Sequence, residues 1–176
     1  MEGAGKDARE WTPAARASSD GFDEFVQRHY ESLAKALALM SLDKQFAADA
    51  AHDAFLRLQL RWSTVDTLED PVAWLYRVGI NRCRDYRRQF TRTARLFERL
   101  VTRAGPEEAG RSWTPDAEFE SLVGRLPKQQ RVAAVLFYQA DLSTAEIARV
   151  MQISQGAAKS HLFRAREALR PLVEAD

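Results

Sequence analysis

Apolar residues recur every three or four positions along most of this chain, a spacing typical of amphipathic helices. The first helix is predicted over residues 22–40, and a second over residues 43–62. The apolar face of the first consists of Phe22, Phe25, Val26, His29, Leu33 and Leu37. No segment alternates apolar and polar residues as a β-strand does, so the pattern predicts an all-α fold.

A third helix is predicted from residue 70 onward. Asp70 can serve as its N-cap, and Pro71 suits the first helical position. Its packing side carries Trp74, Leu75, Val78 and Tyr86, and its apolar pattern fades past Phe97. A fourth helix is predicted to start at Thr114–Pro115 and a fifth at Pro127.

Residues 142–169 predict two short helices joined by a tight turn. Ser143 and Glu146 have the spacing of a capping box, and Ser154 can cap the second helix after Ile153 fills the turn. The second helix is basic and carries Lys159, His161, Arg164 and Arg166. This layout is that of a helix-turn-helix, whose second helix enters the major groove of DNA.

The chain therefore divides into two small helical modules. We predict a disordered tail over residues 1–19, a first module over 20–100, a flexible linker over 101–114 and the helix-turn-helix module over 115–174. The linker is rich in Gly, Pro and charge, so we expect the two modules to move independently.

Charge is distributed unevenly in this chain of 176 residues, although its net charge is only +1. Residues 77–103 hold nine Arg against two acidic residues, and residues 159–170 hold four Lys or Arg against one Glu. Residues 43–70 hold six acidic residues and three basic ones. Two basic patches separated by acidic segments indicate two contacts with a polyanion.

Several classes of protein are disfavoured by what the sequence lacks. Cys83 is the single cysteine, no apolar run is long enough to span a bilayer, and no signal peptide is visible, so we expect a cytoplasmic protein without membrane insertion. The three His residues and Cys83 fall on different elements without metal-ligand spacing. There is no phosphate-binding glycine loop either, so we expect no enzyme activity, no metal and no cofactor.

Three segments together resemble a known family: AADAAHDAFLRL, DPVAWLYRVGINRCRDYRRQ and GRLPKQQRVAAVLFYQADLSTAEIARVMQISQGAAKSHLFRAREAL. They are similar to the sigma-70-type RNA polymerase sigma factors, and more narrowly to the small extracytoplasmic-function (ECF) group, which has only regions two and four. The resemblance covers about residues 22–172. It implies binding to the β′ and β subunits of core RNA polymerase, recognition of a two-part promoter and help with DNA melting. An anti-sigma factor is a further partner that it implies.

The resemblance assigns the contact with the β′ clamp to the second helix. The residues that fall on this segment are Asp49, His52, Asp53 and Phe55. Their spacing places Asp49, His52 and Asp53 on one exposed stripe. His52 stands where the family commonly has Gln.

The third helix falls on the segment that contacts the minus-ten element. The implied contacts are Asn81, Arg82, Asp85, Arg87 and Arg88. An amide can both donate to and accept from a base edge, whereas arginines hold phosphates. The loop Ser63–Asp70 matches the place where the family binds a flipped base, although it lacks the basic residue that many members carry there.

The basic helix of the helix-turn-helix falls on the reader of the minus-thirty-five element. The implied contacts are Lys159, Ser160, His161, Arg164 and Arg166, with Ser160 and Arg166 expected on phosphates. We expect Leu162 and Phe163 to pack in the core, as well as Trp62 and Trp74.

Two other classes of protein are left as alternatives. A helix-turn-helix regulator that acts without core polymerase would have the same C-terminal reader, but it has no use for Asn81 with its arginine run. A helical enzyme is disfavoured because no catalytic constellation is visible. A regulator binds duplex DNA alone, whereas a sigma factor usually needs the core enzyme.

Overall fold

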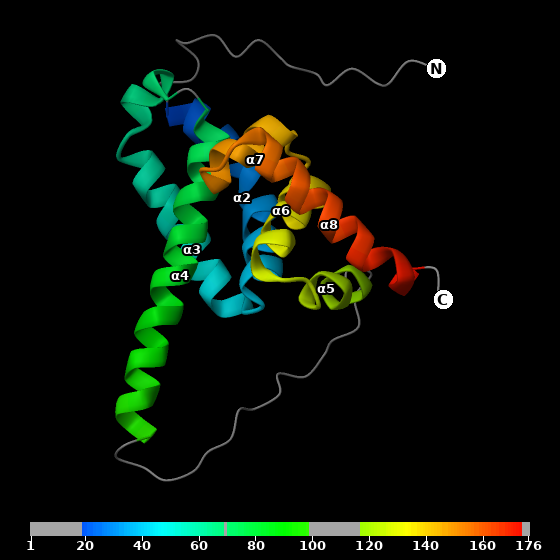
Figure 1. The fold of residues 1–176 in the computed structure, drawn as a ribbon. Helices are drawn as coiled ribbons and strands as arrows, with labels where there is room; N and C mark the ends of the chain where they lie inside the picture. The colour runs from blue at the N-terminus through cyan, green and yellow to red at the C-terminus, as the bar shows by residue number, and fades with distance from the viewer. Residues whose placement is uncertain (1–18, 69, 99–116, 174–176) are drawn as a thin grey trace, which may run out of the picture.

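The computed structural model describes residues 19–68, 70–98 and 117–173, and all regular structure in these ranges is helical (Figure 1). The first part contains α2 (Ser19–Ser41), α3 (Lys44–Gln59), the 3₁₀ helix η1 (Trp62–Thr67) and α4 (Pro71–Glu98). The second part contains α5 (Ala117–Gly124), α6 (Lys128–Tyr138), α7 (Thr144–Met151) and α8 (Gln155–Val173). The all-α prediction is confirmed for these residues. The predicted tail and linker, and the helix start at Thr114–Pro115, lie outside them.

Local hydrogen bonds set several helix starts where the sequence predicts them. The Asp70 carboxylate accepts from the Ala73 N–H at 2.8 Å, and the capping box of Ser143 and Glu146 forms in full. Ser154 Oγ accepts from the Ala157 N–H at 3.1 Å at the start of α8. The second helix is shorter than predicted, because α3 ends at Gln59 and the chain turns into η1.

The first module is a bundle of α2, α3 and α4 around a continuous apolar core. The inner face of α3 is made of small residues, so its neighbours approach closely: Ala47, Ala50, Ala51 and Ala54 are all buried. Gly79 serves the same purpose on α4, since a Cβ there would lie 2.9 Å from Leu37 Cδ1. Trp62 is buried against Phe22 and Phe25, as predicted for packing, and Trp74 is partly buried against the core.

In the second module, α6, α7 and α8 pack together, and α5 lies against α6. Leu136, Ile147 and Leu162 form its centre. The Arg131 guanidinium supports the turn between α5 and α6 by donating to three backbone carbonyl oxygens: Val123 O at 3.1 Å, Gly124 O at 3.3 Å and Leu126 O at 3.1 Å.

The two modules are packed against each other, which differs from the independent movement that we predicted. Figure 1 shows α7 lying against the first half of α4, and α6 also contacts α2. Arg149 of α7 forms an ion pair with Asp70 at the start of α4, with an N–O distance of 2.9 Å. Apolar residues of both modules meet here, among them Ile80 and Val132. The C-terminal part of α4 extends past the rest of the bundle.

None of the helices described in residues 19–173 is long and apolar enough to cross a membrane.

Candidate nucleic-acid interface

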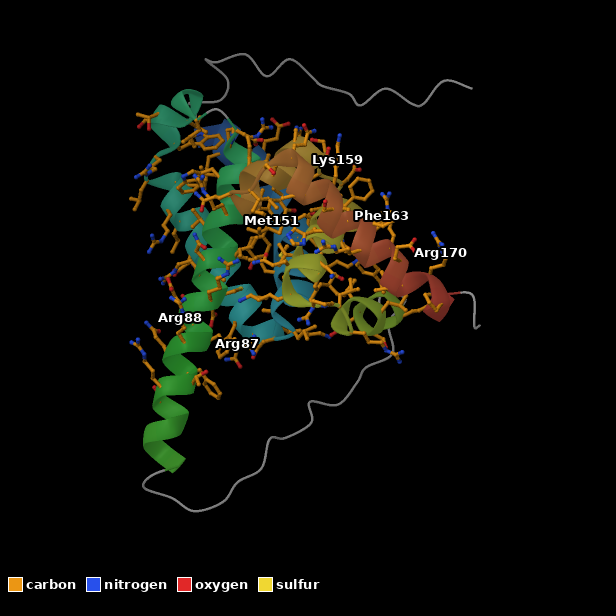
Figure 2. The ribbon with its side chains drawn as sticks, in the orientation of Figure 1. Arg87, Arg88, Met151, Lys159, Phe163 and Arg170 are labelled. Atoms are coloured by element: carbon orange, nitrogen blue, oxygen red, sulfur yellow. The ribbon has the colours of Figure 1, made fainter. Side chains whose placement is uncertain are left out.

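Exposed polar and basic side chains follow one another along α4. Asn81 is exposed, and Arg84 donates to its Oδ1 at a distance of 3.4 Å. One to two turns later, Arg87 and Arg88 are also exposed (Figure 2). Three of the five predicted minus-ten residues are therefore exposed, and Arg84, which the sequence analysis did not select, lies beside them half-buried.

The remaining two predicted residues on α4 belong to a network with α3. The Asp53 carboxylate accepts from Arg82 Nε at 2.7 Å and from the Tyr86 hydroxyl at 2.8 Å. The Arg82 guanidinium lies 5.0 Å from the centre of the Tyr86 ring, and Asp85 is a further ionic neighbour of Arg82 at 3.7 Å. Asp53 and Arg82 thus hold the two helices together, and their predicted contacts with polymerase and phosphate stay predictions.

Protonation follows from this geometry. The Tyr86 hydroxyl and the Arg82 guanidinium both donate to Asp53, and these hydrogen bonds lower the pKa of its carboxyl group. The same carboxylate raises the pKa of Arg82. The pair is therefore ionised at neutral pH.

The outer face of α3 is partly acidic and partly apolar. Asp49 and His52 are exposed, as the predicted stripe requires. Leu56 is 45% exposed and Leu60, just past the helix end, is 86% exposed, which extends the same stripe by two turns. Phe55 is only 5% exposed and packs on Phe25 and Tyr30, so it supports α3 from inside and does not offer its ring to a partner.

Helix α8 presents a basic face with one aromatic residue in it (Figure 2). Lys159, Ser160 and Arg164 are exposed, in agreement with a reader helix. The expectation that Phe163 packs in the core is wrong, because its side chain is 64% exposed, whereas Leu162 is 3% exposed. Leu162 shares a face with the buried Ala158 and Ala165, and Phe163 lies about 100° away from it around the helix.

His161 and Arg166 have intramolecular surroundings. His161 is half-buried, and no hydrogen-bond partner of its buried Nδ1 is found among the described residues. Arg166 Nε donates to the Tyr138 hydroxyl at 2.8 Å, and its guanidinium lies 5.2 Å from the centre of the Phe137 ring. Arg166 therefore ties α8 to the end of α6, although its side chain is exposed.

The segment expected to receive a flipped base is largely the 3₁₀ helix η1. Val65 points into the core, whereas Ser63 and Thr64 are exposed. Asp70, at the end of this segment, is already engaged by Ala73 and Arg149.

The exposed polar and basic surfaces of α4 and α8 and the partly apolar stripe on α3 thus lie on one chain. Two family models match it: residues 25–93 match Sigma-70 region 2, and residues 116–169 match Sigma-70, region 4. The chain belongs to the sigma-70 family.

Relatives place it in the ECF group of sigma factors. The chain is 28% identical over 154 residues to the ECF RNA polymerase sigma factor SigM of Bacillus subtilis, covering 85% of this chain and 93% of that one. It is 29% identical over 178 residues to the RNA polymerase sigma factor CnrH of Cupriavidus metallidurans, covering 93% and 92%.

Solved structures agree with this assignment. The structure of CnrH in complex with the cytosolic domain of CnrY has a TM-score of 0.62 and 30% sequence identity, over 93% of this chain and 94% of that one. The sigma factor RpoE of Bartonella quintana, in a co-crystal with the anti-sigma factor NepR, has a TM-score of 0.70 at 19% identity and shows the shared fold.

A cluster of cations in this sigma factor spans both regions and was missed by sequence analysis. Burial lowers the pKa of Lys128 at the start of α6, and the nearby arginines lower it further. Those arginines are Arg84, Arg87 and Arg88 of α4 and Arg131 of α6. The sequence gives no hint of this cluster, because α4 and α6 are about 40 residues apart in it.

The described residues contain no group of three or more His, Cys, Asp or Glu side chains that could hold a metal ion. Cys83 is buried, its thiol donates to Phe46 O at 3.7 Å, and burial raises its pKa to about 12.

Proposed function

We propose that this ECF sigma factor binds core RNA polymerase, recognises a two-part promoter and promotes DNA melting at initiation. The observation that carries the proposal is the presence, on one chain, of two exposed helix surfaces rich in polar and basic residues. Asn81, Arg87 and Arg88 form the reader on α4, and Lys159, Ser160 and Arg164 form the one on α8.

We assign the minus-thirty-five element to α8. Lysine and arginine suit the O6 and N7 atoms of guanine, and an exposed aromatic edge suits the methyl group of thymine. Phe163 therefore joins Lys159 and Arg164 as a base contact, while Ser160 reaches phosphate. Arg166 acts on this face mainly by holding α8 to Tyr138.

We assign the minus-ten element to α4, with Asn81 as its base-reading residue. Its amide can donate and accept, and Arg87 and Arg88 supply charge for phosphates. Arg82 acts indirectly, because its guanidinium is held by Asp53. Asp85 borders the same surface as a neighbour of Arg82.

The contact with core polymerase is assigned to the outer stripe of α3. Asp49 and His52 provide its polar part, and Leu56 and Leu60 provide an apolar part that sequence analysis did not find. A largely exposed leucine such as Leu60 lowers the stability of the free chain little. Its burial under a partner makes the free energy of binding more favourable. The similarity to CnrH, solved with the cytosolic domain of CnrY, supports an anti-sigma factor as a further partner.

Gel filtration with core RNA polymerase tests the polymerase contact. The chain should co-elute with the core enzyme, and Leu60→Asp should weaken this complex while keeping the helical content. Leu42→Asp is the matched control, since Leu42 is also an exposed leucine, at 49%, but lies in the turn before α3, at the opposite end of that helix from Leu60. Equal loss in both variants, or no complex with the parent chain, would contradict the assignment.

A promoter library separates the two readers. Arg164→Ala should relax base preference at the upstream element alone, and Asn81→Ala at the downstream element alone. Each good bidentate contact is worth about 1–3 kcal/mol of discrimination. If the chain instead binds duplex promoter DNA in a gel mobility-shift assay without core polymerase, it acts as an independent helix-turn-helix regulator.

A further inference from the structure

We propose that the cleft between α4 and α6 binds linked phosphates, the group that nucleoside triphosphates and inorganic polyphosphate share. The lining of this cleft includes cations from both regions, Arg84 and Arg87 from α4 and Lys128 from α6. The site goes beyond promoter recognition and does not depend on it, because these residues lie together in the chain without DNA or polymerase.

The cations around the cleft repel one another. Burial lowers the pKa of Lys128, and the positive charges of Arg84, Arg87, Arg88 and Arg131 lower it further. In the part of the chain that the structure describes, no carboxylate forms an ion pair with any of these five residues. Such a cluster of like charges lowers the stability of the folded chain. A bound anion removes this repulsion, so the cluster favours an anionic ligand over a neutral one.

The cationic side chains that line the cleft keep hydrogen-bond donors for a ligand. Arg84 makes one long hydrogen bond of 3.4 Å, to Asn81 Oδ1. Within the described residues, no side-chain hydrogen bond of Arg87 or Lys128 is found. Arg131 differs, because its guanidinium donates to three backbone carbonyl oxygens, so it adds charge to the site more than donors. Ammonium and guanidinium groups with free donors are the groups that bind phosphate oxygens in proteins.

One carboxylate lies near the cleft. Burial raises the pKa of Cys83, which lines the cleft, to about 12, and the charge of Asp43 contributes to this shift. The Asp43 carboxylate already accepts from the Phe46 N–H at 3.0 Å as the N-cap of α3. The charges that shift the pKa of Lys128 are all positive. One carboxylate against these cations leaves the cleft positive overall.

The size and lining of the cleft favour a phosphate group over a nucleobase. Its volume of about 50 Å³ has room for a few water molecules or for one phosphate. Leu37, Ile80 and Val132 contribute apolar lining, and an apolar wall strengthens the attraction between the cations and an anion. Linked phosphates carry several charges within a few bonds, whereas a nucleic-acid strand carries one charge per nucleotide. The density of cations here therefore suits linked phosphates, with any attached nucleoside left outside the cleft.

Isothermal titration calorimetry of the full chain tests the site. Tripolyphosphate and ATP should each bind at one site per chain, and orthophosphate should bind at least about tenfold more weakly, because it makes fewer charge-assisted hydrogen bonds. Tighter binding of tripolyphosphate than of ATP would identify inorganic polyphosphate as the better ligand, and the reverse order would identify a nucleotide. If none of them binds, or if adenosine binds as tightly as ATP, the proposal is overturned.

Substitutions on both sides of the cleft place the ligand between the two regions. Lys128→Gln and Arg84→Gln should each weaken tripolyphosphate binding about five- to tenfold, since each removes a charged donor. Lys128→Arg keeps the charge and should stay within about twofold of the parent. Circular dichroism checks the helical content, and the variants of the exposed Lys128 decide the test if Arg84→Gln does not fold.

Arg125→Gln is the matched control for these variants. It removes one positive charge from an exposed residue of the α5–α6 turn that does not line the cleft, so it should leave the affinity for tripolyphosphate unchanged. Equal loss in Arg125→Gln and Lys128→Gln would show that the anion responds only to the overall charge, which would overturn the site.

Acylation of lysines, read by mass spectrometry, locates the bound ion. An amine reacts in its neutral form, and the lowered pKa of Lys128 increases the share of that form. Tripolyphosphate should slow acylation of Lys128 at least about fivefold, because a bound anion favours the charged amine. Lys44, exposed on α3, should react at an unchanged rate. Protection of Lys159 on α8 in place of Lys128 would put the phosphates on the basic face of α8 and overturn the proposal.

Discussion

At the scale of single residues, Asp53 shows how one carboxylate joins two functional helices. It accepts hydrogen bonds from Arg82 and Tyr86, and about a quarter of both the Asp53 and the Arg82 side chains is exposed. Asp53→Asn should therefore lower the free energy of unfolding at neutral pH by about 1.5–2 kcal/mol, the lower part of the range for hydrogen bonds to charged groups. Urea unfolding measures this difference.

The pH dependence of that difference has a definite sign. The folded pKa of Asp53 lies below its ordinary value of 3.8, so the carboxylate stabilises the fold above pH 3.8 and this stabilisation is lost as the pH falls through the folded pKa. The gap between the parent and Asp53→Asn should be constant from about pH 6 to 8 and shrink below pH 3.8. A gap that widens in acid would show that Asp53 is not the ionised member of this network.

Phe163 and Leu162 are neighbours with opposite surroundings, 64% and 3% exposed. Leu162→Ala should cost about 2–5 kcal/mol of unfolding free energy, because it leaves a cavity in region 4. Phe163→Ala should stay within about 0.5 kcal/mol of the parent, yet alter base preference at the upstream promoter element. Thermal unfolding measures the change in stability, and the promoter library measures the change in base preference. Strong destabilisation by Phe163→Ala would show that Phe163 packs in the core after all.

The difference between these two neighbours could be predicted from the sequence. Ala158, Leu162, Ala165 and Leu169 recur at helical spacing and define the inward stripe of α8, so Phe163 cannot lie on it. The partners of Asp53 could not be predicted, since Arg82 and Tyr86 lie 29 and 33 positions away and only the packing of α3 on α4 brings them together.

At the scale of elements, helix starts are local and follow from the sequence. Asp70 and Ser143 cap the helices that they were predicted to cap, because each bond spans three residues. The short turn between α5 and α6 instead depends on hydrogen bonds from the Arg131 guanidinium to three carbonyl oxygens. These bonds span more residues than a helix cap does, and the sequence pattern does not predict them.

Arg131→Lys should destabilise region 4 by about 1–3 kcal/mol, because an ammonium group cannot replace a planar fork with several donors. Arg125→Lys, on the exposed part of the same turn, is the control and should change stability by less than about 0.5 kcal/mol. Chemical denaturation distinguishes them. Equal stability of both variants would mean that the Arg131 hydrogen bonds contribute nothing to the fold.

At the scale of the whole molecule, the two regions meet through residues that are remote in sequence. Arg149 on α7 and Asp70, which caps α4, are 79 positions apart. The apolar pattern of each helix is explained by packing within its own module, so the sequence predicted separate modules. The interface becomes visible only when α6 and α7 are seen beside α2 and α4 (Figure 1).

Lys128→Glu should strengthen the packing of region 4 on region 2, because it replaces repulsion from Arg84, Arg87 and Arg88 by attraction. Energy transfer between dyes attached to exposed positions of α2 and α8 should rise, and the rise should be smaller in high salt, which screens exposed charges. Energy transfer in Lys128→Gln, which removes the charge without reversing it, should lie between that of the parent and that of Lys128→Glu. A fall in energy transfer for Lys128→Glu would show that the cation cluster does not push the two regions apart.

Run-off transcription with purified core RNA polymerase and genomic promoter fragments tests the central claim most directly, that this chain is an initiation factor with two promoter readers. We predict transcripts that require the chain, that start from a subset of fragments, and that disappear when either the upstream or the downstream element is scrambled. Fragments transcribed equally with and without the chain, or no transcript from any fragment although the chain is folded, would contradict the account.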